Sequence, residues 1–273
     1  MKLLVAALLL PPAARRAPPP RAASPPPPPP PRPADVARAL NAHLPPDDPI
    51  HNATLFLSSA EVSFPDGAAA SARGFCATYL PLAATRSHSR ALLLLAPAPP
   101  ASLRPLTERL ALGCECVALL PTLDGPPARW THATLAAEAL AASRHLLRAH
   151  GVSHLGVLAF GAACQPALEL LADGGIEAHA AVLLCPHALR GAARAARALE
   201  LPLLAVCTRA DDAAELREGL QLNARLGGDF FVAEFAGCAD EFALAPRDEA
   251  AREQAERAFA LMQAWFDRHV PEV

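Results

Sequence analysis

The chain has 273 residues, of which 52% are hydrophobic and 19% charged, and its formal net charge is −3. This length and composition suffice for one compact domain with a large core, and the mildly acidic balance argues against a nucleic-acid-binding protein, which needs a concentrated basic face. Aromatic residues make up only 5% of the chain, so the core should consist mainly of Leu, Val and Ala.

The first 33 residues differ in composition from the rest. Met1, Lys2 and the short apolar run LLVAALLL resemble a secretory signal peptide, and this run is too short to span a bilayer. The proline-rich segment up to residue 33 should form an extended, disordered tether. We therefore predict a targeting leader and tether over 1–33, a folded domain over 34–273, and no stable membrane span. A functional leader would direct the chain to secretion or to an organelle, and Asn52 would then be a glycosylation acceptor.

From about residue 52 onwards, apolar runs alternate with amphipathic segments. Two runs of alternating polarity, 53–64 and 73–82, are joined by Pro-Asp-Gly and predict an antiparallel hairpin. Further continuous apolar runs predict buried strands, and periodic segments predict helices. The predicted strands cover 89–97, 116–121, 155–160, 180–185, 202–207 and 230–235, and the predicted helices cover 102–112, 131–151, 163–172, 188–199, 212–226 and 247–269.

Strands that alternate with helices predict parallel crossover connections and helices on both faces of one sheet. The predicted class is therefore α/β, with a mostly parallel eight-stranded sheet.

Cysteine and histidine spacing indicates no metal site. The seven cysteines lie mostly inside apolar runs, where a free thiol behaves as a small hydrophobic group. Cys114 and Cys116 are too close for a zinc knuckle, and no second pair accompanies them. The histidines form no cluster in the sequence. We expect neither a metal ion nor a cofactor.

Four consecutive small residues, Gly161-Ala162-Ala163-Cys164, follow the predicted strand 155–160. In hydrolases, this strand-turn-helix arrangement places a nucleophile at the tip of the turn. An acid and a histidine then follow on later loops, because the nucleophile needs a base and the base needs a carboxylate to orient it.

From about Arg73 to His269 the chain resembles the dienelactone hydrolases, whose members typically carry a Cys nucleophile, an Asp and a His. The resemblance lies in RGFCATYLPLAA, LTERLALGCECVALLPTLDG, HLGVLAFGAACQPALELLA, LPLLAVCTRADD and FAGCADEFALAPRDEAAREQAERAFALMQAWFDRH. The last stretch is the most specific, because the family has a small-residue loop, His-Gly-Phe and a long terminal helix there. The resemblance implies an α/β-hydrolase fold and the hydrolysis of carboxylic esters or lactones.

The family's roles fall on three positions of this chain. The nucleophile position is occupied by Gly161, the histidine position by Asp240, and the acid position by Asp211, which alone keeps the family's residue type. This implies a pseudoenzyme in which the family's chemistry is impaired or lost.

Two alternatives remain open. An active ester or lactone hydrolase could use Cys164 as its nucleophile, but the strand would then run through Gly-Ala-Ala, which are poor strand formers. With Gly161 at the turn, Pro166 falls in the first helical turn, where its missing N–H is tolerated. His187 should also lie at the carboxyl edge of the sheet, and we expect it to face solvent.

The second alternative is a non-catalytic ligand- or partner-binding protein. Gly161 enlarges the cleft, and the N–H groups at the start of the following helix favour anions. The expected ligand is a small carboxylate, ester or lactone.

Overall fold

The computed structural model describes residues 56–65, 71–80, 88–97, 100–123, 132–187, 189–225 and 228–271. The predicted leader and tether, the domain boundary at residue 34 and the glycosylation acceptor Asn52 lie outside these residues. Within the described part of the chain, no helix is both long enough and apolar enough to cross a membrane.

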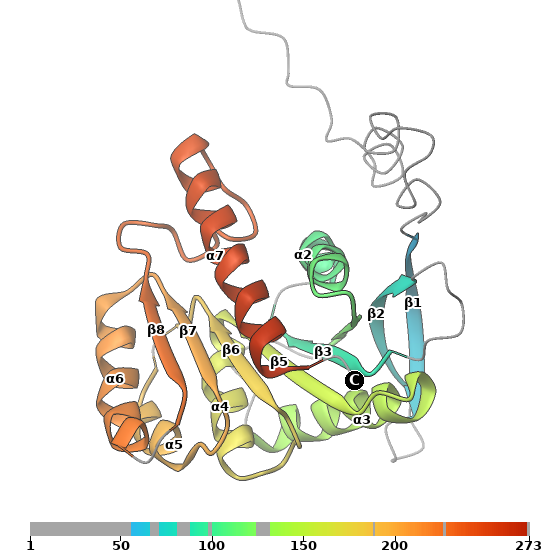
Figure 1. Cartoon of the computed structure of the whole chain (residues 1–273), viewed down its shortest axis with the longest axis horizontal. Coiled ribbons are helices and arrows are strands. Elements are labelled where there is room, and N and C mark those ends of the chain that lie inside the picture. The colour runs from blue at the N-terminus through green and yellow to red at the C-terminus, as the bar shows by residue number, and fades with distance from the viewer. Residues whose placement is uncertain are drawn as a thin grey trace, which may run out of the picture. The chain divides into compact units, whose positions relative to one another are not determined.

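Eight strands form a single sheet in the order β1-β2-β4-β3-β5-β6-β7-β8 (Figure 1). The strands are β1 (Phe56–Pro65), β2 (Ser71–Leu80), β3 (Arg90–Leu95), β4 (Val117–Pro121), β5 (His154–Phe160), β6 (Ala180–Leu184), β7 (Leu203–Cys207) and β8 (Phe230–Glu234). β2 pairs antiparallel with both β1 and β4, and all other neighbours are parallel. The predicted hairpin and the mostly parallel sheet are therefore confirmed.

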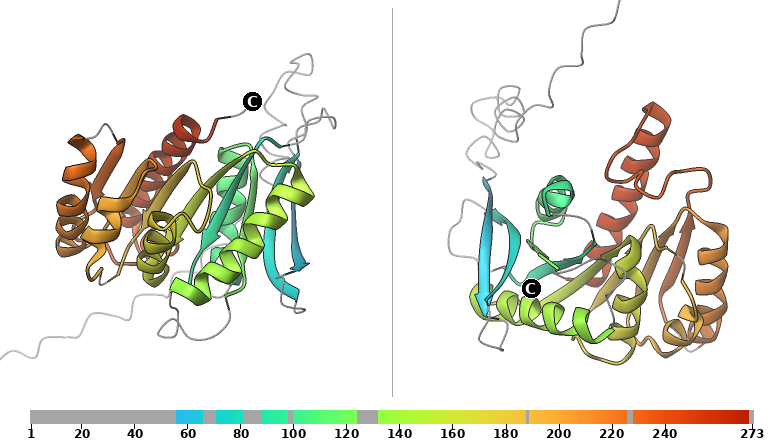
Figure 2. Two further views of the ribbon diagram at one scale, coloured as in Figure 1. Left: turned by 90° about the horizontal axis from the view of Figure 1, so that it is seen from below. Right: turned by 180° about the vertical axis from the view of Figure 1, so that it is seen from behind.

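Helices cover both faces of the sheet, as Figure 2 shows. The helices are α2 (Pro100–Gly113), α3 (His132–His150), α4 (Cys164–Ala172), α5 (Ala192–Ala198), α6 (Ala210–Arg225) and α7 (Glu249–His269). α2 and α7 pack on one face, and α3 to α6 pack on the other. Two separate hydrophobic clusters result, one on each side of the sheet.

β5 shows why the central strands read as continuous apolar runs. Its side chains point alternately to the two faces, so Leu155, Val157 and Ala159 join the cluster under α3 to α6, whereas Leu158 and Phe160 join the cluster under α7. A strand that is covered on both faces has no solvent-facing positions and therefore no polar alternation.

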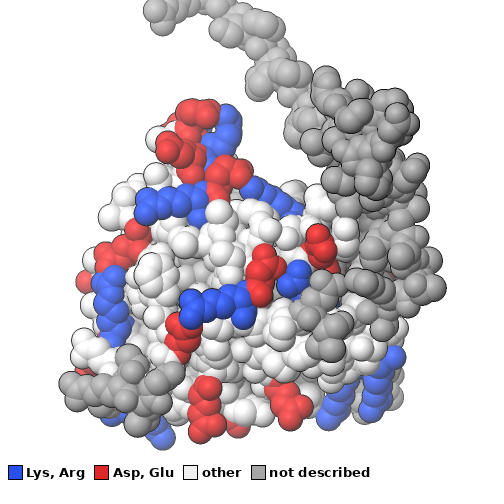
Figure 3. Space-filling model, viewed as in Figure 1, with Lys and Arg blue, Asp and Glu red and all other residues white. Residues whose placement is uncertain are grey.

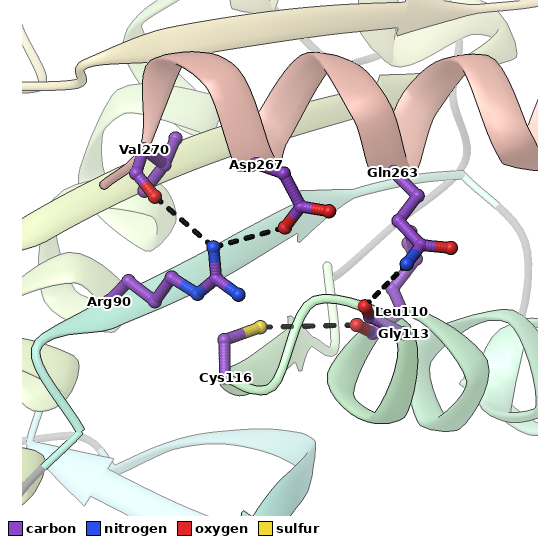
Figure 4. Close-up of polar contacts among 7 residues, drawn as sticks. All are labelled: Arg90, Leu110, Gly113, Cys116, Gln263, Asp267 and Val270. Atoms are coloured by element: carbon purple, nitrogen blue, oxygen red, sulfur yellow. Dashed lines mark hydrogen bonds and ion pairs between the residues drawn. The ribbon is translucent and has the colours of Figure 1, made fainter. Parts of the chain in front are cut away.

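α7 is tied to the sheet by polar contacts near its C-terminal end (Figure 4). Arg90 of β3 donates from Nη1 to Asp267 Oδ1 at 3.0 Å and to the carbonyl oxygen of Val270 at 3.4 Å. Gln263 Nε2 donates to the carbonyl oxygen of Gly113, at the end of α2, at 2.7 Å. The terminal helix is thereby fixed to both β3 and α2.

Charged side chains on the face that carries α2 and α7 are mixed in sign (Figure 3). Several form ion pairs between elements: Arg109 of α2 pairs with Glu256 of α7, and Arg104 of α2 pairs with Glu61 of β1. These pairs link elements that are distant in the sequence.

Two predicted helices are preceded by turns or loops that the sequence did not indicate. The segment predicted as a helix from residue 163 opens with a short 3-10 turn, Gly161–Ala163, before α4 begins. The helix predicted over 188–199 is shortened to α5, because the chain after β6 first turns through positive φ angles at Cys185 (50°) and Gly191 (69°). This longer loop carries His187 towards the site described next.

Candidate active site

Gly161 occupies the turn directly after β5, with a φ of +59°. A Cβ atom built at this position would lie 3.8 Å from Pro97 Cγ and 4.0 Å from His187 Cε1, both ordinary contacts. The turn thus has the position expected of a nucleophile elbow and space for a Cβ atom. It presents no reactive atom of its own.

Cys164 lies three residues further on, as the first residue of α4, and is 0% exposed. Its Sγ donates to the carbonyl oxygens of Ala159 at 3.2 Å and Leu184 at 3.6 Å. Burial raises the pKa of this thiol well above its ordinary value, so the thiolate that would attack a carbonyl is disfavoured. Pro166 falls in the first turn of α4, in keeping with Gly161 rather than Cys164 at the tip of the turn.

Asp240 lies in the loop between β8 and α7. Thr208, the first residue after β7, donates from its hydroxyl to Asp240 Oδ1 at 2.7 Å. Two residues further on, Phe242 is 1% exposed and stacks on Phe235, with 5.3 Å between the ring centroids. The buried phenylalanine pair anchors this loop, and Thr208 orients the carboxylate.

His187 connects Asp240 with the turn. Its Nε2 lies 3.2 Å from Asp240 Oδ2, and its ring edge at Cε1 faces the position that a side chain at residue 161 would occupy. The imidazole is 37% exposed, so it keeps contact with solvent while Nε2 faces Asp240. The sequence predicted that His187 lies at the carboxyl edge of the sheet, but it gave no sign of the contact with Asp240, because that contact joins loops that follow different strands.

The loop that carries His187 is fixed from two sides. Gln165 of α4 accepts a hydrogen bond from the backbone N–H of Arg190 and donates to its carbonyl oxygen, both at 2.9 Å. Asp212 of α6 accepts from the backbone N–H of Leu189 at 2.9 Å. These contacts hold the segment just beyond His187.

Asp211, the residue at the family's acid position, is exposed in the first turn of α6. Among the described residues, no hydrogen bond or ion pair joins it to His187 or Asp240. The neighbouring Asp212 is the buried one, at 4% exposure, and it bonds to a loop backbone rather than to an imidazole. The structure therefore brings Gly161 and Asp240 together through His187, and it does not bring Asp211 to them.

A hollow of about 170 Å³ lies away from this turn, between α2, α7 and residues 243–246. Its lining is largely apolar, with Leu106, Leu244 and Phe259 among its walls. Arg109 and Glu256, which pair with each other, also border it.

No family model matches the sequence, and no curated protein matches it. Solved structures do match. A putative dienelactone hydrolase from Klebsiella pneumoniae is 18% identical with a TM-score of 0.63, over 77% of this chain and 98% of that one. A dienelactone hydrolase-like promiscuous phosphotriesterase from metagenomic libraries is 16% identical with a TM-score of 0.63, over 79% and 99%.

A thermostable esterase from Pseudomonas putida is also similar, with 13% identity and a TM-score of 0.60, over 87% of this chain and 89% of that one. These likenesses accompany the mostly parallel eight-stranded sheet of this chain. The chain therefore has the α/β-hydrolase fold, in the form found in dienelactone hydrolase and esterase structures.

Proposed function

We propose that this chain is a dienelactone-hydrolase-like protein that has lost the family's covalent route of ester and lactone hydrolysis. The observation that carries the proposal is Gly161, which stands at the turn after β5 with room for a Cβ atom and no atom that can attack. Covalent hydrolysis requires a nucleophile within reach of a base, and removal of the nucleophile typically lowers the rate by several powers of ten.

Cys164 does not replace the missing nucleophile at this turn. Cys164 is the nearest thiol in the sequence, and its Sγ is fully buried and bonded to two carbonyl oxygens. This placement argues against the alternative of an active hydrolase that uses Cys164.

The geometry favours a small carboxylate, ester or lactone as the ligand. The first N–H groups of a helix lack intrahelical partners and attract anionic or polar oxygen atoms, and the 3-10 turn Gly161–Ala163, which leads directly into α4, starts at residue 161. His187 adds an imidazole beside the same space. A binding protein for such a ligand would use these groups without covalent chemistry.

The test is hydrolysis of p-nitrophenyl acetate and of a lactone by the purified full-length chain. We expect no burst of p-nitrophenol and no acylated protein in the intact mass spectrum. A burst close to one equivalent per chain would overturn the proposal. If such a burst disappeared in Cys164→Ala, Cys164 would be the nucleophile.

A further inference from the structure

His187, Thr208 and Asp240 come from three loops at the carboxyl ends of the neighbouring strands β6, β7 and β8. Thr208 binds one oxygen of the Asp240 carboxylate at 2.7 Å, and the other oxygen lies 3.2 Å from His187 Nε2. The Thr208 hydroxyl, the Asp240 carboxylate and the His187 imidazole therefore contact one another in a row. The imidazole is the group nearest to Gly161.

The contact between His187 and Asp240 is close without being an aligned hydrogen bond. Nε2 is shielded from solvent and has no hydrogen-bond partner of good geometry among the described residues. A buried polar atom without a partner is unfavourable, and a small rotation of the ring towards Oδ2 would remove this cost. Hydrogen bonds between catalytic groups are often loose in unliganded proteins and tighten when a ligand is bound.

The free edge of the imidazole points to the space that Gly161 leaves open. Cε1, which lies 4.0 Å from the Cβ position, is bonded to both ring nitrogens. Because Nε2 faces the carboxylate, Nδ1 is the nitrogen left to accept a proton. No hydrogen bond of the described residues occupies Nδ1.

We propose that His187 is a general base that activates a water molecule in the space of the missing nucleophilic side chain, with Asp240 and Thr208 as positioning residues. The substrate class is small activated carboxylic esters, which this water hydrolyses in one displacement without an acyl-enzyme. The proposal rests on the proposed function, because it applies to a chain that has no covalent route.

The reaction balances without a further reagent. His187 Nδ1 takes a proton from the water as the water oxygen bonds to the ester carbonyl carbon. The tetrahedral intermediate then collapses, the bond from that carbon to the alkoxy oxygen breaks, and the imidazolium returns its proton to the leaving group. The products are one carboxylic acid and one alcohol.

The first experiment puts a nucleophile back at the turn. In Gly161→Ser and Gly161→Cys, the new side chain starts within contact distance of His187. We expect each single variant to hydrolyse p-nitrophenyl acetate at least about 100-fold faster than the unaltered chain, the scale of one positioned base. Adding His187→Ala should remove this gain and bring the rate down to that of His187→Ala alone.

The second experiment uses the unaltered chain. His187→Ala should lower the hydrolysis rate above buffer by at least about tenfold, whereas His179→Gln, which removes a histidine at the opposite end of β6, should leave it unchanged. Asp240→Asn should lower kcat with little change in KM, because the carboxylate acts on the imidazole rather than on the substrate. Thr208→Ser should keep the activity that Thr208→Val loses.

Two outcomes separate the two proposals. If Gly161→Ser and Gly161→Cys fold, as judged by circular dichroism, and gain no activity that depends on His187, the general-base assignment is wrong while the loss of the covalent route stands. A burst from the unaltered chain would instead remove the proposed function and with it the reason for an attacking water. If neither Gly161 variant folds, an unaltered rate in His187→Ala would still overturn the assignment.

Discussion

Asp211 and Asp212 are adjacent acids at the start of α6 with opposite surroundings. Asp212 is 4% exposed and accepts from the Leu189 backbone, whereas Asp211 is exposed. Asp212→Ala leaves a buried N–H without a partner and should lower the free energy of unfolding by about 1–3 kcal/mol. Asp211→Ala should change it by less than about 0.5 kcal/mol. Urea unfolding of the two variants measures both changes. Equal effects would contradict the view that Asp212, and not Asp211, stabilises the fold.

The cysteines should differ in their reaction with iodoacetamide. Cys238 is the one cysteine of the seven that is not buried, although partial desolvation raises its pKa. Burial raises the pKa of Cys164 much further. In the folded protein at pH 8, we expect alkylation at Cys238 first and none at Cys164 until urea is added. Peptide mass spectrometry measures both, and equal labelling rates would show that Cys164 is accessible.

At the scale of single residues, the sequence predicted the places of Gly161 and His187 at the carboxyl edge of the sheet but not the contact between His187 and Asp240. Gly161 follows an apolar strand directly, so its place could be predicted from local pattern alone. The role of His187 depends on long-range facts: β5 beside β6, and the left-handed turn at Cys185. Asp211 and Asp212 are neighbours in α6, and adjacent positions of a helix point in different directions. One of the two side chains is therefore exposed and the other buried.

At the scale of elements, the docking of α7 can be tested at Arg90. Its side chain is 11% exposed and bonds to Asp267 and to the carbonyl oxygen of Val270. Arg90→Met keeps the aliphatic stem and removes these bonds, so it should destabilise the fold by about 1–2 kcal/mol. Arg252→Met, which breaks the exposed pair with Glu249, should cost less than about 0.5 kcal/mol. Chemical denaturation curves decide, and similar shifts for both would contradict a special role for Arg90.

The predicted strands are confirmed within a few residues, since runs that are buried on both faces leave a clear hydrophobic signal. In the sheet, β4 lies between β2 and β3, so the strand order departs from the order along the chain. The hydrophobic pattern gives no signal for this, because it does not show which strands pair. α5 is shorter than predicted for a related reason: alanine-rich sequence favours helix from residue 188, but the loop is held by Gln165 and Asp212 from other elements.

At the scale of the whole molecule, several histidines make stability depend on pH in the same direction. Burial is the main cause that lowers the pKa of His145, His150, His179 and His269 below the ordinary value of 6.5. The unfolded chain therefore binds protons at a higher pH than the folded chain does. This contribution to stability is complete above about pH 6.5 and is lost as the pH falls through the lower folded-state values.

We expect the free energy of unfolding to decrease between pH 7.5 and pH 5.5. His145→Phe removes one of these titrating groups while it keeps a ring against Phe64, whose centroid lies 5.2 Å from that of His145. The difference in stability between the two pH values should be smaller in this variant than in the unaltered chain. Urea unfolding at both pH values measures it, and an unchanged difference would exclude His145 as a contributor.

The left-handed backbone at Gly161 also affects the folding free energy of the chain. Glycine adopts a φ of +59° freely, whereas a residue with a side chain typically stores about 1–3 kcal/mol of strain there. Since a Cβ would meet only ordinary contacts, the difference arises in the backbone alone. A chain with glycine at this turn thus avoids a backbone strain that a nucleophilic side chain would impose. Replacing Gly161 with a nucleophile should therefore lower the stability of the fold even where it raises the rate of hydrolysis.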